Sequence, residues 1–226
     1  MPATPSAKPA TSPAQKALRK LGLVRDIDLA LHLPLRYEDE TRIVRLVDAR
    51  EGDTVQIEAT VTACEVTFRP RRQLLVTVDD GSETCLLRFF SFYPSQQKAL
   101  AVGARIRARG EVRGGFAGHT MMHPAFRAAG GELPTALTPV YPSVAGLPQA
   151  YLRKAVLGGL AHADLSDTLP PVALSGSSEN SSEINLQPLW SLRESLLFLH
   201  HPAPDVALAT LEDHSHPAWQ RLKAEE

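Results

Sequence analysis

Alternation of apolar and polar residues between Thr54 and Met122 constrains the fold of this chain more than any other feature of its sequence. In the first alternating stretch every second residue is apolar, namely Val55, Ile57, Ala59, Val61 and Ala63. Successive side chains of a β-strand point to opposite faces, so this period predicts a strand with one buried face.

Turn signals separate four further strand-like stretches, which cover residues 74–78, 83–90, 104–113 and 116–122. The turn Asp79-Asp80-Gly81 is typical of a hairpin. Residues 95–100 could form one or two helical turns, and the last strand stops at His123-Pro124. Three strands, a short helix and two strands are the order of an OB-fold, so we expect a five-stranded OB-fold β-barrel.

Helical periodicity flanks the strand region on both sides. It occurs at residues 17–33, 149–162, 186–199 and from Trp219 onward. Ser191, with Glu194 three residues later, gives a capping-box signal. A Ser-rich stretch at 174–184 predicts a mobile loop. The last helical pattern stops without a cap, and we expect a truncated chain.

These patterns predict an α+β chain with N-terminal helices, a barrel and a C-terminal segment of linker and helices. The expected parts are a disordered tail (1–16), an N-terminal helical segment (17–50), the OB-fold domain (51–128) and the linker with helices (129–226).

Charge is distributed unevenly, although the formal net charge is only -1. Between Thr84 and Arg127 the single acid is Glu111, and the cations are Arg88, Lys98, Arg105, Arg107, Arg109, Arg113 and Arg127. Beyond Leu160 acids dominate. A basic middle on an otherwise acidic chain is typical of a localised phosphate-binding face, and a solvated basic strand face is the alternative.

Motifs of the common enzyme classes are absent from the sequence. It contains no G-x-x-x-x-G-K-[ST], G-x-S-x-G, H-E-x-x-H or C-x-x-C pattern. We therefore predict no catalytic residue and no metal ligand. Cys64 and Cys85 fall in strand-like runs and are expected to be buried thiols. No run of eighteen apolar residues occurs, so no membrane span is expected.

Four aromatic residues, Phe89, Phe90, Phe92 and Tyr93, lie together at the end of the third strand. Alternation lets only one of Phe89 and Phe90 point inward, so one or two of the four rings should be exposed. Exposed rings beside arginines are typical of a nucleic-acid surface, because rings stack on unpaired bases and arginines contact phosphates. Alternatively, the rings cap the open end of the barrel.

Several segments, in this order, resemble the RecG family of ATP-dependent helicases, which remodel stalled forks and Holliday junctions. They are Leu21-Gly-Leu-Val with Leu31-His-Leu-Pro-Leu-Arg-Tyr-Glu-Asp39, Leu87-Arg-Phe-Phe-Ser-Phe-Tyr93, Met122-His-Pro124, Leu137-Thr-Pro-Val-Tyr-Pro142 and Arg221-Leu-Lys-Ala-Glu-Glu226. The resemblance covers most of the chain from about Leu18. It implies that the barrel is the family's wedge, which sits at the branch point of DNA, and that the C-terminal segment leads toward a motor absent from this sequence.

The resemblance implies a set of DNA-binding residues. Phe90 matches the third-strand aromatic that stacks at the branch, Tyr93 lies close to the second stacking position, and Phe92 could substitute for Tyr93. The expected phosphate contacts are Arg88, Lys98, Arg105, Arg107, Arg109 and Arg113. The family's nucleotide-binding motifs lie downstream of Glu226, so ATP and Mg²⁺ are cofactors of the full-length family and none is expected in this chain.

We therefore expect a module that binds branched DNA in recombination and repair, monomeric and in the cytoplasm near the nucleoid. By itself the chain lacks the motifs needed to hydrolyse ATP. The alternative is an OB-fold interaction module that docks an acidic peptide, such as the tail of a single-strand-binding protein.

Overall fold

The computed structural model describes residues 12–69, 71–114, 118–167, 169 and 189–224. It divides into two compact units. We call residues 39–135 the barrel unit, and residues 1–38 together with 136–226 the helical unit.

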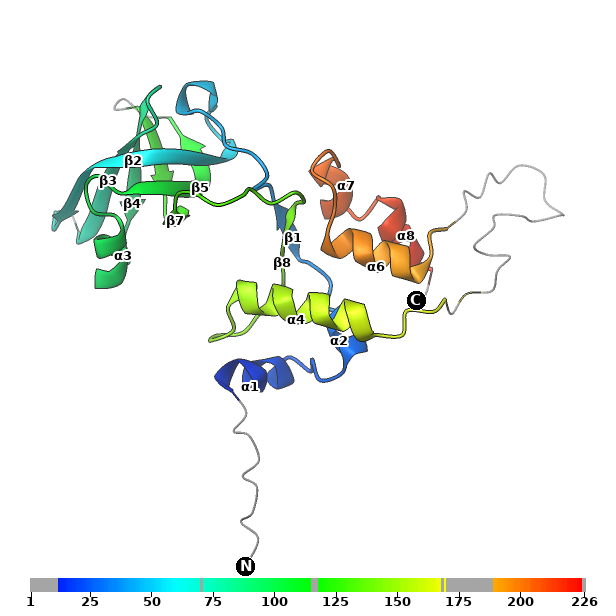
Figure 1. The fold of residues 1–226 in the computed structure, drawn as a ribbon. Helices are drawn as coiled ribbons and strands as arrows, with labels where there is room; N and C mark the ends of the chain where they lie inside the picture. Colours follow the sequence, from blue (N-terminus) through cyan, green and yellow to red (C-terminus); the bar gives the residue numbers. More distant parts are fainter. Residues whose placement is uncertain (1–11, 70, 115–117, 168, 170–188, 225–226) are drawn as a thin grey trace, which may run out of the picture. The chain divides into compact units, whose positions relative to one another are not determined.

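The barrel unit is a closed five-stranded mixed β-barrel with one additional strand (Figure 1). Its strands are β2 (Thr54–Thr67), β3 (Gln73–Asp79), β4 (Thr84–Phe89), β5 (Arg105–Arg113), β6 (His119–Met122) and β7 (Ala125–Ala128). The sheet order is β2-β3-β4-β6-β5-β7, and a further pairing of β2 with β5 closes the barrel. β4 and β6 run parallel, whereas the other pairs are antiparallel. The expected OB-fold barrel is confirmed.

Two short helical elements complete the barrel unit. Helix α3 (Pro94–Ala99) lies between β4 and β5, where the sequence predicted one or two helical turns. The 3₁₀ helix η1 (Leu46–Asp48) precedes β2 and is tied to the β3–β4 turn, because the Leu46 N–H donates to an Asp80 carboxylate oxygen at 2.7 Å.

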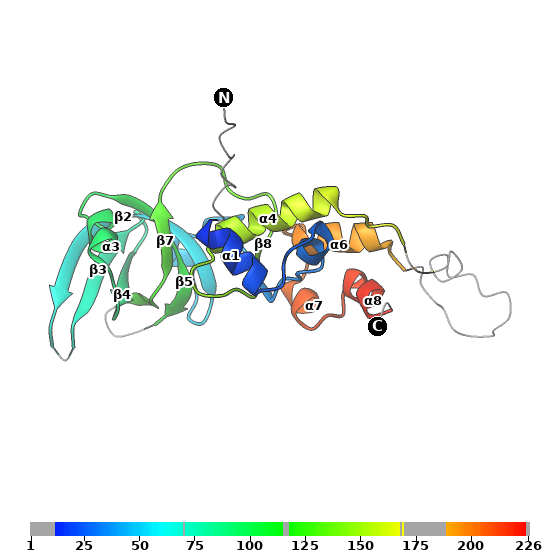
Figure 2. The same cartoon turned by 90° about the horizontal axis from the view of Figure 1, so that it is seen from below.

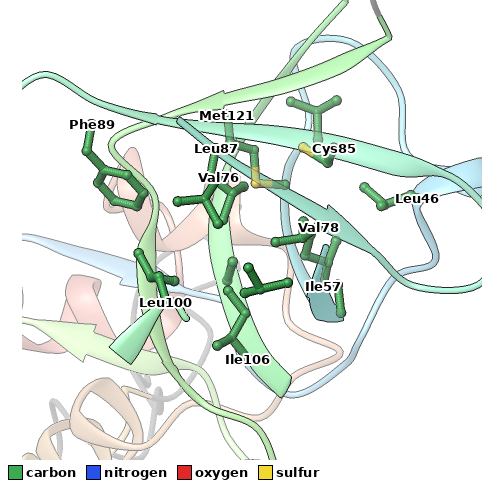
Figure 3. Packing of buried hydrophobic residues seen from close by; sticks show 14 of the residues in the cluster. Leu46, Ile57, Val76, Val78, Cys85, Leu87, Phe89, Leu100, Ile106 and Met121 are labelled. Atoms are coloured by element: carbon green, nitrogen blue, oxygen red, sulfur yellow. The ribbon is translucent and has the colours of Figure 1, made fainter. Parts of the chain in front are cut away.

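The alternating apolar residues of the strands form the barrel core (Figure 3). Ile57, Val76, Leu87 and Ile106 come from four different strands, and each is at most 2% exposed. Phe89 also points into this core. Removal of apolar surface from water is the main force that favours such an arrangement, so the two-residue period fixes which face of each strand is buried.

Strand β7 was not predicted, because the strand region was expected to stop at His123-Pro124. Instead the backbone turns at His123, which has a φ of 47°, and β7 pairs with β5 from Arg109↔Ala125 to Ile106↔Ala128. Gly110 of β5 permits this turn, because a Cβ atom there would lie 3.2 Å from the Cβ of Pro124. The proline ends one strand but does not prevent the next.

The helical unit contains six helices among its described residues. They are α1 (Pro13–Lys20), α2 (Asp26–Ala30), α4 (Gln149–His162), α6 (Leu192–His200), α7 (Leu208–Glu212) and α8 (Pro217–Lys223). Helix α4 has the predicted bounds, and Ser191 forms the predicted capping box with Glu194 at the start of α6. Helix α1 begins within the expected tail, because Ser12 and Gln15 cap it reciprocally.

Strands β1 (Arg36–Glu38) and β8 (Thr138–Val140) form an antiparallel two-stranded ladder in the helical unit. Close packing joins α2 to α4, where a Cβ atom on Gly159 would lie 2.5 Å from the Leu29 Cβ. Figure 2 shows α6, α7 and α8 together in the same unit. Buried His200 donates from Nε2 to the Ala30 carbonyl at 2.8 Å, and its Nδ1 accepts from the Tyr141 hydroxyl at 2.8 Å.

Some expectations fall outside the described residues. These are the tail up to residue 11, the Ser-rich stretch at 174–184 and the start of the fifth strand at 116–117. The expected domain bounds at residues 16, 50 and 128 stay predictions. Within the described residues, no helix is long and apolar enough to cross a membrane.

Candidate nucleic-acid interface

Arginines and aromatic rings meet where the turn between β2 and β3 approaches the segment after β4. The strand register brings them together, because Thr67 pairs with Gln73 and Leu74 pairs with Phe89. We call this set the arginine–aromatic surface; it consists of Phe68, Arg69, Arg71, Arg72, Arg88, Phe90, Tyr93 and His123.

Phe90 is half-buried and is contacted from several sides. The Arg71 Cζ atom lies 3.6 Å from the centroid of the Phe90 ring, and the Arg88 Cζ atom lies 5.6 Å from it. The His123 ring meets Phe90 edge-on at 5.2 Å between centroids, and its Nε2 accepts the Phe90 backbone N–H at 3.2 Å. Phe89 points inward and Phe90 points outward, so only one of the two rings enters the core, as alternation requires. The orientation of Phe90 is therefore set by cation–π contacts and by His123.

Tyr93 and Phe92 have opposite environments. Tyr93 is 73% exposed, and its backbone N–H is bound by the Gln96 side chain at the start of α3. Phe92 is only 7% exposed and packs into the barrel core, with the Arg72 Cζ atom 4.3 Å from its ring centroid. Phe92 therefore belongs to the barrel core, and Tyr93 offers the more accessible ring.

The arginines of β5 are mostly engaged with carboxylates. Arg105 and Arg107 both contact Glu58 of β2, at 2.9 and 2.7 Å, and these contacts hold the pKa of Glu58 below its usual range. Arg107 is only 7% exposed and also donates to the Gly131 carbonyl at 2.9 Å. Arg113 contacts Glu111 at 3.4 Å, across solvent-exposed surface. Arg107, expected as a phosphate contact, is thus buried against an acid, because the β2–β5 register places Glu58 opposite it.

Arg109 is half-buried and lines a hollow of about 110 Å³ on the outer side of β5. Its other lining residues are Glu40, Gln56, Arg107, Ala125, Phe126 and Arg127. The hollow is too small for a nucleobase with its sugar. The carboxylate of Glu40 lines the hollow together with three arginines, and its negative charge weakens the attraction of the hollow for an anion.

The two remaining predicted cations lie elsewhere on the barrel unit. Arg88 of β4 donates to the Gln73 side chain at 3.0 Å and so belongs to the arginine–aromatic surface. Lys98 is exposed on α3, beside an open hollow of about 420 Å³ that Cys64 and Val102 also line. The structure therefore brings Arg88, Phe90 and Tyr93 into one region and leaves Lys98 on a neighbouring one.

Five residues of the surface were not predicted from the sequence, namely Phe68, Arg69, Arg71, Arg72 and His123. The stretch Arg69-Pro70-Arg71-Arg72 lies between two strand-like stretches, and nothing in its period links it to the third strand. A usable signal was its composition, because three arginines in four residues exceed what a hairpin turn requires.

Groups for covalent or metal chemistry do not gather in the part of the chain that the structure describes. No three His, Cys, Asp or Glu side chains there are placed to hold a metal ion. Cys64 and Cys85 are both free, and burial raises the pKa of the Cys85 thiol to about 12. A thiol with so high a pKa is inert as a nucleophile.

Comparison with known proteins gives consistent results at three levels. Residues 7–162 match the family model of the RecG wedge domain. The chain is 38% identical over 216 residues to the ATP-dependent DNA helicase RecG of Pasteurella multocida, and 38% identical over 219 residues to that of Escherichia coli strain K12. Each match covers 92% of this chain, which spans only 29% of the length of either relative.

The fold is also similar to that of a solved protein. A structure of RecG bound to a three-way DNA junction superposes with a TM-score of 0.61 and 23% sequence identity. The match covers 92% of this chain and 27% of that one.

Proposed function

Because this chain belongs to the RecG wedge-domain family, we propose that it binds branched DNA as the wedge of a RecG-like ATP-dependent helicase. Its substrates are stalled replication forks and Holliday junctions, and its role lies in recombination and repair. The coupling of ATP hydrolysis to movement is proposed for a whole RecG-like protein, of which this chain spans a part.

One observation carries this proposal: rings with accessible faces lie beside cations on one part of the barrel. Tyr93 is 73% exposed, and Phe90 is exposed in part. Stacking of a base on such a ring contributes about 1–3 kcal/mol, and it requires an unpaired base, which a branch point supplies and a continuous duplex does not.

Among the residues predicted to bind DNA, the proposal retains Phe90 and Tyr93 as stacking rings and Arg88 and Lys98 as phosphate contacts. The β5 arginines contribute less, because a phosphate has to compete with Glu58 for Arg105 and with Glu111 for Arg113. We further propose residues 51–128 as the wedge itself and a monomer as its state.

Fluorescence anisotropy with a labelled three-way fork and a matched linear duplex, at low and moderate salt, tests the proposal. We expect tighter binding to the fork and weaker binding as salt rises, because phosphate contacts release counterions. Equal affinity for both DNAs, or an affinity unaffected by salt, contradicts it. An acidic peptide in the same titration tests the docking of a single-strand-binding protein tail, which the similarity to RecG does not favour.

A further inference from the structure

We propose that the turn between β2 and β3 is a second nucleic-acid contact, in which Arg69, Arg71 and Arg72 bind phosphates and Phe68 stacks on an unpaired base. The ligand is a second unpaired strand, which lies next to the strand whose base stacks on Phe90. This inference rests on the proposed function and extends it to the turn between β2 and β3.

The first argument is the state of the turn's cations. Arg69, Arg71 and Arg72 are exposed, and none of them takes part in an ion pair with the carboxylates of the described residues. The β5 arginines, by contrast, share Glu58 and Glu111. Three neighbouring cations that form no ion pair with the described carboxylates raise the local positive potential. A bound polyanion reduces the repulsion among them.

The second argument is the exposure of Phe68. Its side chain is 71% exposed at the start of the turn, immediately after β2 ends at Thr67. Only Tyr93 among the other described aromatic side chains of the barrel unit is as exposed, at 73%. A phenylalanine in water contributes nothing to the barrel core, whereas its ring offers a face to a base.

The third argument is that the turn is held against the segment after β4. Arg71 lies on the Phe90 ring, Arg72 lies on the Phe92 ring, and Arg88 donates to Gln73. The three contacts hold residues 71–73 of the chain against β4 and the segment after it. They therefore fix the position of this part of the turn relative to Phe90. A guanidinium that contacts a ring through its face still has N–H donors at its edges, and a phosphate oxygen can accept them.

The ligand follows from this combination of groups. A duplex presents phosphates but no free base faces, so it would use the arginines and leave Phe68 unused. An unpaired strand presents both. The surface therefore fits a strand whose bases are unstacked, and Phe68 distinguishes that strand from a duplex.

Removal of two arginines from the turn tests the phosphate contact against a matched pair on β5. The variants are R71A/R72A and R105A/R113A, made in the full chain, and both lower the net charge by the same amount. With R71A/R72A we expect the slope of log affinity against log salt for the fork to fall by about 1.4, since each lost single-strand contact removes about 0.7. With R105A/R113A we expect less than half of that change. Equal changes for the two pairs would overturn the assignment.

Substitution of Phe68 tests the stacking contact. F68A should weaken fork binding by about 5- to 100-fold and leave duplex affinity unchanged, and F68Y should restore fork binding, because both aromatic rings stack. An exposed side chain can be removed without loss of the fold, which circular dichroism of each variant verifies. Unchanged fork affinity in F68A would overturn the stacking role.

These outcomes separate the inference from the proposed function. If the unmodified chain shows no preference for the fork, the proposed function fails. If the unmodified chain prefers the fork and the turn variants bind it equally well, only the role of the turn fails.

Discussion

Phe90 and Phe92 illustrate how closely spaced residues of the same type take different roles. Alternation predicted that only one of Phe89 and Phe90 would point inward, and the structure places Phe89 inside the barrel. It gave no guidance for Phe92, because β4 ends at Phe89 and the chain bends before α3. The bend returns Phe92 to the core and leaves Tyr93 in solvent.

The exposed part of the Phe90 ring leads to a prediction on binding. Phe90→Ala should weaken binding to a three-way fork by about 5- to 100-fold and leave duplex affinity nearly unchanged, because only the fork offers an unpaired base for stacking. Anisotropy titrations with the two DNAs at one salt concentration measure the effect. An equal loss on both DNAs would show that Phe90 supports the surface as a whole and does not read the branch.

Cross-strand contacts explain why the surroundings of the β5 arginines could not be predicted from the sequence. The outward positions of β5 follow from its period, but whether an arginine there is free depends on the residue opposite it. Glu58 is separated from Arg107 by 49 residues in sequence, and only the register of β2 with β5 reveals the pair. The alternation of a single strand contains no information on that register.

Buried His200 makes the stability of the helical unit depend on pH. Burial lowers its pKa to about 4 from an ordinary 6.5. Below pH 6.5 the unfolded chain therefore binds a proton that the folded chain does not, and stability decreases as the pH falls toward 4. We expect a loss of about 2 kcal/mol between pH 7 and pH 5.

Urea unfolding followed by tryptophan fluorescence at these two pH values measures the effect. His216, whose pKa is also lowered by burial, adds to it. His200→Asn keeps a polar side chain at this position and should remove most of the pH dependence. If the stability of this variant depends on pH as before, the dependence comes from groups other than His200.

At the level of elements, the helices were predicted more accurately than the short strands. The bounds of α4 follow from its leucine period, and Ser191 with Glu194 defines the start of α6. Strands β1, β7 and β8 have three or four residues each, which is too short for a period to be visible. Each forms because a partner strand lies beside it, and that partner is not contained in the local sequence.

Adjacent glycines of α4 provide a matched test of its packing against α2. A Cβ atom at position 159 would lie 2.5 Å from the Leu29 Cβ and 2.8 Å from the Asp26 carbonyl oxygen, whereas one at position 158 meets nothing within 4 Å. Gly159→Ala should destabilise the helical unit by about 1–3 kcal/mol through overpacking. Gly158→Ala should stabilise it by about 0.5–1 kcal/mol, because alanine favours the helix.

Thermal or urea unfolding of both variants measures the difference. Equal effects of the two substitutions would mean that α2 and α4 adapt to the extra methyl group without cost.

At the level of the whole molecule, each unit contains its own hydrophobic cores, and both tryptophans, Trp190 and Trp219, belong to the helical unit. Their fluorescence therefore reports the unfolding of that unit, whereas far-ultraviolet circular dichroism reports both. The cores could be predicted from apolar periodicity, but the assignment of residues 12–38 and 136–224 to one unit could not, because it joins the two ends of the sequence.

Phe92→Ala should separate the two signals. Removal of a ring that is 7% exposed in the barrel core costs about 3–5 kcal/mol. We expect the circular dichroism signal to show an earlier transition in urea, while the transition seen by tryptophan fluorescence stays in place. A shift of both signals by the same amount would show that the two units unfold as one.

The ladder of β1 and β8 gives the chain an unusual connectivity. Glu38 pairs with Thr138, so the backbone departs for the barrel and re-enters the helical unit at neighbouring positions. The barrel is in effect an insertion into a hairpin. Excision of residues 39–135 and their replacement by a tight turn should leave β1 and β8 as an ordinary hairpin. We also expect that another barrel with a different binding preference can replace this one at the same two strand ends, without changes to the helical unit.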